Sequence, residues 1–395
     1  MNTRWFAGIH ISFDFRRIEA AMVGIHGHGD GVPIECRKTM SFDLPDDIAE
    51  CFDPENVNSH TVRLVGELAE VEEEALKELI AESRISPSEL LAVGVLDRGI
   101  WEFSDTGRYY YPLSNSEMLA ERTGMNIVDS FSARDIACGG KGGPLLPFPA
   151  WIVLCNEKAD RVLVDLGKTA RLTLLPKPNH ATAYDAIDYH DVVSCGELLD
   201  ELTRILTRGK TTIDYGGLMT VQGKHIPELL SRCMELDSNI PQIAWSPFGL
   251  SPEPFLRLVG ELSIANNWTV SDVLCTISYF IAYKIASAIE KNFPKSSTEL
   301  VLSGGGCRNG LLLNQLRKHL DGWSCKQIQD CGVSVEAFDA VCVAILAFLF
   351  VDRIPAAITR ITGAKEAKPL GRLTPGSPQN WKRLNGELRH ENVEL

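Results

Sequence analysis

The sequence LVLSGGGCRNG at residues 300–310 carries the strongest local signal for the fold, because an apolar strand pattern leads directly into three glycines. The apolar run before the glycines predicts a buried strand, and the apolar residues 311–320 predict a helix after them. Gly304, Gly305 and Gly306 lack side chains, so a flat or anionic ligand can approach their backbone, and the following helix N-terminus adds unpaired N–H groups. A nucleotide-binding turn and a tight turn without a ligand are about equally consistent with these residues.

Outside this stretch, the apolar spacing predicts further strands and helices in two groups. In the first group we expect a hairpin, two helices and an intervening strand: residues 7–11 with 18–23, 60–83, 115–123 and 91–96. In the second group we expect strands, then helices, then the strand of the glycine turn: residues 151–154, 161–166, 172–175, 195–206, 270–292 and 299–302. The apolar run 340–351 predicts a buried helix, and the polar segment from residue 374 resembles a tail. Two lobes are therefore expected.

Composition excludes several classes of protein. The chain has 395 residues, which favours about two or three folding units. Apolar residues make up 45% and charged residues 23%, as in ordinary globular proteins, and the net charge of −13 opposes nonspecific binding to nucleic acid or anionic lipid. The 11 cysteines are odd in number and show no CxxC spacing, so we expect reduced cysteines in a cytoplasmic protein. No signal-peptide pattern opens the chain, and residues 340–351 are too short to cross a membrane.

Several familiar motifs are absent or incomplete. Gly-Lys-Thr occurs at Gly167 and at Gly209, but neither has the upstream glycine of a phosphate-binding P-loop, and GxGxxG, GxSxG and HExxH do not occur. The segment containing His26, His28 and Asp30 offers metal-ligating groups, but a solvated glycine-rich loop explains it better.

Two other segments are candidates for chemistry. Arg134 and Asp135 precede a glycine-rich segment, residues 139–145, which suits a hinge, a surface for a sugar or phosphate, or a plain linker. Asp185, Asp188 and Asp191 cluster before a predicted helix, where a carboxylate can serve as a general base toward a sugar hydroxyl, although most such acids are simply solvated.

Taken in order, these segments make the chain resemble the 1,6-anhydro-N-acetylmuramic acid kinases, a branch of the actin, Hsp70 and sugar-kinase superfamily. The similarity runs from Gly8 to about Pro375. Its segments are LAERTG at 119–124, RDIA at 134–137 with GGKGGPL at 139–145, GGGCRN at 304–309, DA at 339–340, ITGA at 361–364, LG at 370–371 and PG at 375–376.

The resemblance implies a fold and an activity. It implies an α/β, two-lobed, actin-like (ribonuclease H-like) sugar-kinase fold with a central cleft for ATP and Mg²⁺. It also implies phosphorylation of an anhydro-amino sugar recovered from the cell wall, in which water opens the anhydro ring with an aspartate as base. The implied lobes are residues 1–135, completed by the helix region 339–372, and residues 136–338, followed by a polar tail at 373–395.

The first phosphate loop departs from the family pattern SGTSxDG. The aligned residues 11–17 are ISFDFRR, so Ser12 and Asp14 occupy positions that the resemblance assigns to the phosphates. Phe13 and Phe15 are too bulky for close backbone approach, unless Arg16 or Arg17 binds the phosphate as a charge pair.

Other implied site residues are partly rewritten. The family's HGQT at the sugar site is LDRG here, which assigns Asp97 and Arg98 to the sugar, together with Arg134, Asp135 and Gly140. The second phosphate segment, NIGGIAN, is DLGKTAR, with Gly167 and Lys168 at phosphate positions. The adenosine-side residues Gly304, Gly305, Gly306 and Asn309 are retained.

The resemblance also assigns the catalytic carboxylates. Counting back from the helix places the family's catalytic aspartate at Asp191, whereas counting forward from the preceding strand favours Asp185; we prefer Asp191. Asp339 replaces a family glutamate and is expected to hold Mg²⁺ through water.

Three functions therefore compete. The first is an ATP- and Mg²⁺-dependent kinase of a small sugar, cytoplasmic, without nucleic-acid or membrane partners, and with a homodimer as an option because the family often forms dimers. The second is a pseudokinase that binds a sugar, nucleotide or protein, since losing the phosphate grips would cost several orders of magnitude in rate. The third is a site for a different acidic substrate, built on Arg16, Arg17, Lys168 and Arg171.

Overall fold

The computed structural model describes residues 3–12, 16–29, 31–45, 48, 59–104, 107–178, 183–241 and 246–390. The chain divides into two compact units. Unit 1 comprises Met1–Leu154 and Gly332–Leu395, and unit 2 comprises Cys155–Cys331. The structure thus places the first boundary about twenty residues later than residue 135, because the glycine-rich segment and the helix after it pack within unit 1. The C-terminal region from Gly332 also belongs to unit 1.

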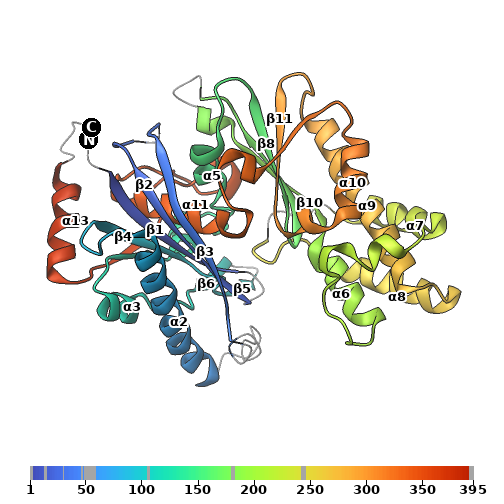
Figure 1. Ribbon diagram of the computed structural model, residues 1–395, viewed down its shortest axis with the longest axis horizontal. Coiled ribbons are helices and arrows are strands. Elements are labelled where there is room, and N and C mark those ends of the chain that lie inside the picture. Colours follow the sequence, from blue (N-terminus) through green and yellow to red (C-terminus); the bar gives the residue numbers. More distant parts are fainter. Residues whose placement is uncertain are drawn as a thin grey trace. The chain divides into compact units, whose positions relative to one another are not determined.

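Unit 1 is built on a six-stranded sheet with the strand order β13-β7-β4-β1-β2-β3 (Figure 1). Its strands are β1 Arg4–Ile11, β2 Arg17–Ile25, β3 Ile34–Asp43, β4 Leu90–Leu96, β7 Ile127–Asp129 and β13 Arg372–Thr374, with a separate hairpin of β5 Ile100–Ser104 and β6 Gly107–Tyr111. Its helices are α2 Ser59–Ser83, α3 Ser116–Thr123, α4 Phe131–Ala137, α5 Pro147–Leu154, α11 Phe338–Val351, α12 Thr359–Thr362 and α13 Pro378–His390, with a 3-10 turn, η6, at Val335–Ala337.

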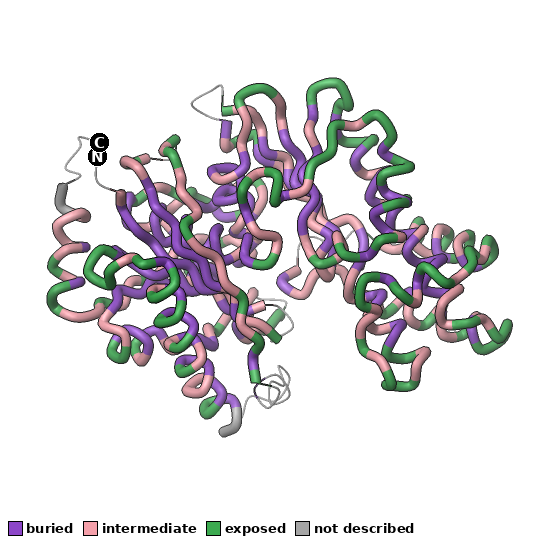
Figure 2. The backbone as a smooth tube through the Cα atoms, viewed as in Figure 1, coloured by how far each residue is buried: buried purple, intermediate pink, exposed green. Residues whose placement is uncertain are grey.

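The two faces of this sheet pack against different helices. Along β1, side chains alternate between faces, so Ala7 and Ile9 share an apolar cluster with Leu64 and Leu68 of α2. On the other face, the ring of Phe6 meets that of Phe348 in α11, with ring centroids 5.7 Å apart. Burial on both faces explains why the central strands are mostly apolar, and Figure 2 shows that these strands are largely buried.

Gly8 sets the distance between β1 and α11. A Cβ built on Gly8 would lie 1.9 Å from the backbone oxygen of Ala340 and 2.5 Å from the backbone nitrogen of Ala344. Any side chain there would push the helix away, so glycine is required for this close approach. Residue 10, two positions further along the strand, lies on the same face and is therefore directed toward the start of α11.

Unit 2 contains a five-stranded sheet with the order β10-β9-β8-β11-β12. Its strands are β8 Asp160–Leu166, β9 Thr169–Leu175, β10 Asp188–Ser194, β11 Thr298–Ser303 and β12 Ser324–Gln327. Its helices are α6 Gly196–Leu206, α7 Pro227–Asn239, α8 Glu253–Asn266, α9 Val270–Asn292 and α10 Gly310–His319. The 3-10 turns are η1 Ala183–Ala186, η2 Tyr215–Gly217, η3 Thr220–Gln222, η4 Gly305–Arg308 and η5 Ile328–Cys331.

Helix α9 is the main core helix of unit 2. Ile277 and Ile281 of α9 share a buried apolar cluster with Val162 and Val164 of β8. The helix begins as its sequence predicts, with the Thr269 side chain accepting a hydrogen bond from the Asp272 backbone. By length and composition α9 is the one described helix that is able to cross a membrane, but 67% of its apolar window is buried within the protein, as in a core helix.

Most predicted elements are confirmed, and two are wrong. Residues 151–154 belong to helix α5 rather than to a strand, because a short apolar run buried on all sides has no period that separates the two. The segment from residue 374 is not a tail: it contains α13, which begins with Pro378 at a position where a missing N–H costs nothing. The buried Asn380 ties that helix to the backbone oxygen of Gly124 at 2.7 Å.

Candidate active site

Ser12 closes the hairpin between β1 and β2. Its backbone N–H donates to the Arg17 oxygen, and its hydroxyl accepts from the Arg17 N–H, both at 2.9 Å. Arg17 also pairs with Asp43 at 3.5 Å. Phe13, Asp14 and Phe15, which include the predicted phosphate position Asp14, lie outside the described residues. Within the described part of the hairpin, the Ser12 hydroxyl therefore stabilises the turn itself.

A polar cluster lies beside this turn, beginning two residues before Ser12 on β1 and two residues after Arg17 on β2. His10 and Glu19 are directly opposite each other on β1 and β2, and Asp339 lies in the first turn of α11. His10 Nδ1 is 3.3 Å from Glu19 Oε2 and 4.0 Å from Asp339 Oδ2. We call His10, Glu19 and Asp339 the His10 cluster. It is the one group of three potential metal ligands among the residues that the structure describes.

The protonation of the His10 cluster follows from its surroundings. Burial by itself would lower the pKa of His10, but the hydrogen bond to Glu19 and the charges of Asp339 and Asp97 outweigh it and raise that pKa. Burial raises the pKa of Glu19, partly offset by the same hydrogen bond. Both shifts have one meaning: the pair holds a proton more tightly than the separate groups would. The family resemblance indicated only Asp339. His10 and Glu19 were detectable as polar residues on the buried strands of a hairpin.

Asp97 is a buried carboxylate with several donors. It accepts from the Tyr110 hydroxyl at 2.7 Å and from the backbone N–H of Leu113 at 2.6 Å, and also from the Ser114 N–H. Burial raises its pKa against these hydrogen bonds. Its contacts fix the chain between β6 and α3. The neighbouring Arg98 contributes its backbone oxygen to the Trp101 indole N–H at 2.8 Å.

Asp135 organises the glycine-rich segment after α4. Its Oδ2 accepts from the Gly142 N–H at 2.8 Å, and its backbone oxygen accepts from the Gly140 N–H at 2.9 Å. A Cβ on Gly140 would lie 2.1 Å from Asp135 Oδ2, so Gly140 is needed for this packing. Lys141 is joined to Thr362 by a backbone hydrogen bond of 2.8 Å. The segment that the sequence offered as a hinge or ligand surface is thus anchored within unit 1.

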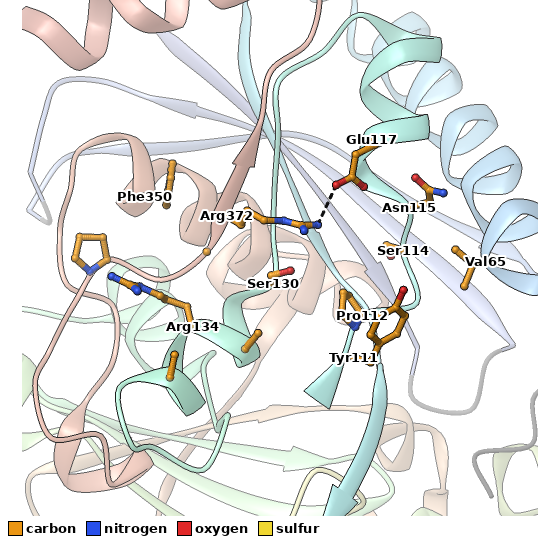
Figure 3. Close-up of a pocket in the computed structure, with 14 residues that line it drawn as sticks. Val65, Tyr111, Pro112, Ser114, Asn115, Glu117, Ser130, Arg134, Phe350 and Arg372 are labelled. Carbon is orange, nitrogen blue, oxygen red and sulfur yellow. Dashed lines mark ion pairs between the residues drawn. The ribbon is translucent and has the colours of Figure 1, made fainter. Parts of the chain in front are cut away.

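Arg134 lines a different part of unit 1, a hollow of about 780 Å³ shown in Figure 3. Arg372 also lines it, pairs with Glu117 at 3.6 Å and makes a two-point contact with Asp129 at 2.8 and 3.1 Å. The lining also includes Ser114, whose hydroxyl donates to the buried Glu72 at 2.6 Å. Burial raises the pKa of Glu72 to about 8. Of the predicted sugar residues, only Arg134 lines this hollow.

In unit 2, the three glycines of the sequence LVLSGGGCRNG have different reasons to be glycine. Gly304 has φ of 86° and a Cβ there would lie 2.4 Å from Asp165 Oδ1, while a Cβ on Gly306 would meet Leu166 at 2.8 Å. Packing against the end of β8 accounts for both. A Cβ on Gly305, by contrast, would have nothing within 4 Å. Gly305 is therefore the position where open space, rather than packing, borders the turn.

Asn309 links this turn to α10. Its side-chain oxygen accepts from the Leu312 N–H at 3.1 Å as the helix N-cap. A Cβ on Gly217 would lie 2.6 Å from that oxygen, so η2 packs closely against the cap. Asn309 thus positions the glycine turn at the start of α10.

The second predicted phosphate segment forms the turn between β8 and β9. The backbone oxygen of Gly167 accepts from Gly196 at 3.0 Å, and that of Lys168 accepts from Cys195 at 2.7 Å. These bonds satisfy N–H groups at the beginning of α6. The turn therefore supports the helix that follows Asp191.

Asp191 lies on β10 with its side chain only 6% exposed. Its Oδ1 accepts from the Tyr189 hydroxyl at 2.8 Å and from Arg171 Nε at 3.2 Å. Arg171 also lies 4.0 Å from Asp165. Asp185, the alternative, lies on η1 and is exposed. Since Arg171 and Arg17 both pair with carboxylates, two of the four cations of the acidic-substrate hypothesis are already neutralised.

Comparison with known proteins gives the family. The family model for anhydro-N-acetylmuramic acid kinase matches residues 12–376. Relatives with that name include proteins of Nitrosospira multiformis, 29% identical over 82% of this chain and 85% of theirs, and Ralstonia nicotianae, 30% identical over 78% and 80%. The protein of Caldanaerobacter subterraneus is 26% identical over 90% of this chain and 93% of its own.

Solved structures superpose loosely. Component A of the Acidaminococcus fermentans (R)-2-hydroxyglutaryl-CoA dehydratase is 11% identical with a TM-score of 0.41, and covers 87% of this chain and 97% of its own. A ROK hexokinase of Thermus thermophilus is 13% identical with a TM-score of 0.32, over 86% and 97%.

The chain is an α/β protein with one large sheet in each of two units, as predicted. Because the family model matches nearly its whole length, the chain belongs to the anhydro-N-acetylmuramic acid kinase family. The predicted family resemblance is confirmed.

Proposed function

We propose that this protein is an ATP-dependent kinase that phosphorylates 1,6-anhydro-N-acetylmuramic acid or a closely related anhydro-amino sugar. The match of residues 12–376 to the family carries the proposal, since it includes residues of both units. The product would belong to the recycling of cell-wall sugars, in the cytoplasm, without nucleic-acid or membrane partners. A homodimer is part of this proposal because the family often forms dimers.

The proposed reaction forms and breaks a defined set of bonds. Water attacks the anomeric carbon, and the carbon–oxygen bond of the anhydro bridge breaks. The freed oxygen then takes the γ-phosphoryl group of ATP, and ADP leaves. Asp191 is proposed to take the proton of the attacking water. Tyr189 and Arg171 both donate to Oδ1 of Asp191, which orients the carboxylate.

The nucleotide is proposed to approach Gly305, because a ligand can occupy the space that no side chain fills there. Gly304, Gly306 and Asn309 would hold that turn in place, with Gly167 and Lys168 on the neighbouring β8–β9 turn. When bound, Mg²⁺ would neutralise the phosphate oxygens during transfer. Asp339, whose side chain is about half exposed in the first turn of α11, would hold that ion through water, since Mg²⁺ prefers oxygen ligands and retains several of its own waters.

In unit 1, Asp97, Arg98, Arg134, Asp135 and Gly140 are proposed to serve the sugar side. Their contacts suggest two different roles, positioning of the chain and contact with the ligand. Asp97 and Asp135 would position the segments around them, since their carboxylates accept hydrogen bonds from buried backbone groups. Arg134 would face the ligand more directly, because its side chain is exposed on the wall of a hollow.

A transfer assay tests the proposal. Purified protein is mixed with ATP, Mg²⁺ and 1,6-anhydro-N-acetylmuramic acid, and mass spectrometry looks for a sugar that has gained one water and one phosphoryl group. Asp191→Asn is expected to lower kcat by about 100-fold or more, whereas Asp185→Asn is expected to remain near the parent rate. No transfer by the parent protein would refute the kinase, and ATP binding without transfer would favour a pseudokinase.

A further inference from the structure

Two members of the His10 cluster have no part in the proposed reaction. The family resemblance assigns only Asp339 to a hydrated Mg²⁺. His10 and Glu19 are largely buried, with side chains 16% and 18% exposed, and both project from the strands at the centre of unit 1. A largely buried histidine with two carboxylates nearby is costly to desolvate, so its presence on a central strand calls for an explanation.

The spacing of the three groups suits direct metal coordination. In a tetrahedral site with metal–ligand bonds of about 2.0–2.1 Å, neighbouring ligand atoms lie about 3.3 Å apart. The 3.3 Å between His10 Nδ1 and Glu19 Oε2 equals that edge and is longer than the modal N–H···O distance of about 2.9 Å. The 4.0 Å to Asp339 Oδ2 is longer, and all three ligand atoms lie within 4.8 Å of one another. A small rotation of the Asp339 side chain, which is 47% exposed, would close the site.

Rigid elements hold these ligands. His10 and Glu19 are paired across an antiparallel ladder, in which opposite Cβ atoms are about 4.5–5.5 Å apart. Gly8 lets α11 approach β1 closely, which brings Asp339 to the same face of the sheet as His10. Other charged groups also act on the cluster: Asp97 on His10, and Arg17 on Glu19. Among these groups only Arg17 is a permanent cation, and it also pairs with Asp43.

We propose that His10, Glu19 and Asp339 bind a divalent transition-metal ion directly, with Nδ1 of His10 as a nitrogen ligand. Imidazole suits Zn²⁺, Co²⁺ or similar ions, whereas Mg²⁺ prefers oxygen ligands and retains its water. The site would therefore prefer a transition metal to Mg²⁺. This inference rests on the proposed function for the use of the ion in catalysis, but the binding itself stands on the three side chains.

Absorption spectroscopy with Co²⁺ tests the site in the full chain. The parent protein is expected to develop visible d–d bands on titration with Co²⁺, in the absence of nucleotide. His10→Asn is expected to raise the apparent Kd for Co²⁺ at least about tenfold and to change the band positions, because a nitrogen ligand is lost. Asp339→Asn is expected to weaken binding as well. Since the Asp339 side chain is about half exposed, that variant keeps the test valid if His10→Asn fails to fold.

His26→Asn is the matched control. His26 also lies near a glutamate, with Nε2 at 3.7 Å from Glu35, but no third ligand joins the pair among the described residues. This variant is expected to bind Co²⁺ as the parent does. Unchanged Co²⁺ binding in His10→Asn and Asp339→Asn, or equal loss in His26→Asn, would overturn the proposal.

The outcomes for the metal site and for the kinase are separable. Sugar phosphorylation with Mg²⁺ combined with His10-independent Co²⁺ binding would overturn the metal site and leave the kinase standing. His10-dependent Co²⁺ binding without any transfer to the sugar would support the metal site and refute the kinase.

Discussion

Buried carboxylates are stabilised in two different ways in the two units. In unit 2, Asp191 is paired with Arg171, a permanent cation, and receives a further hydrogen bond from Tyr189. In unit 1, Glu19 is paired with His10, whose charge depends on its proton, and Asp339 lies close by. The charge of an arginine is permanent, so it always neutralises the carboxylate beside it, whereas the proton on a histidine can be replaced by a metal ion. The first arrangement is suited to orient a carboxylate, and the second to bind a cation.

The largest effect is expected where the His10 cluster depends on helix packing. Gly8→Ala would place a Cβ 1.9 Å from the Ala340 oxygen, which forces α11 away from β1. We expect the free energy of unfolding to fall by about 3 kcal/mol, because a tightly packed core cannot absorb the added methyl group. Urea denaturation measures the loss.

Gly66→Ala is the control for that substitution. Gly66 lies inside α2, and a Cβ there would have nothing within 4 Å. Alanine is expected to stabilise the helix by about 0.5–1 kcal/mol. A Gly8→Ala protein as stable as the parent would show that α11 is not held close to β1. The explanation of how Asp339 comes to lie near His10 would then fail.

A somewhat smaller effect is expected in unit 2. Arg171→Met removes the cation from Asp191, whose side chain is only 6% exposed, and is expected to cost about 2 kcal/mol of unfolding free energy. The comparison is Arg257→Met on α8, where the arginine is 72% exposed and 3.6 Å from Glu253. That change is expected to lie within about 0.5 kcal/mol of the parent. Equal effects of the two substitutions would contradict the structural pairing of Asp191.

The smallest effect is expected from the proton on His10. Because the folded-state pKa of His10 is raised above 6.5, its charged form stabilises the fold below pH 6.5, and this contribution is lost as the pH rises through the folded-state pKa. The difference should be below about 1 kcal/mol. Metal-free His10→Asn should show a flatter pH dependence of unfolding free energy than the parent, and an identical dependence would count against the His10–Glu19 pair.

The sequence was sufficient for elements with a long or clear period. The β1–β2 hairpin, α9 and the buried β11 are all confirmed, since alternation, helical spacing and capping residues agree there. Residues 151–154 were assigned to the wrong class because the run is short and apolar throughout. The C-terminal helix α13 was missed because its sequence is mostly polar, and a polar sequence gives no sign of the buried contact that Asn380 makes with Gly124.

The candidate site was less predictable than the fold. The family resemblance indicated Asp191 and Asp339, and the sequence pattern indicated the glycine turn, but neither revealed that Gly304 and Gly306 pack against β8 while Gly305 borders open space. Nor did either pair His10 with Glu19, because the partners depend on the register of the hairpin. Register follows from the turn, and the sequence at residues 11–17 departs from the family pattern.

The most direct test of this account identifies the atom that binds the metal. Pulsed electron paramagnetic resonance of the full-length protein loaded with Cu²⁺ detects magnetic coupling to nitrogen-14 of an imidazole ligand. The account predicts imidazole coupling in the parent protein and in His26→Asn, and its loss in His10→Asn. A spectrum with oxygen ligands alone, or with nitrogen coupling that persists in His10→Asn, would contradict the assignment of His10 as a ligand.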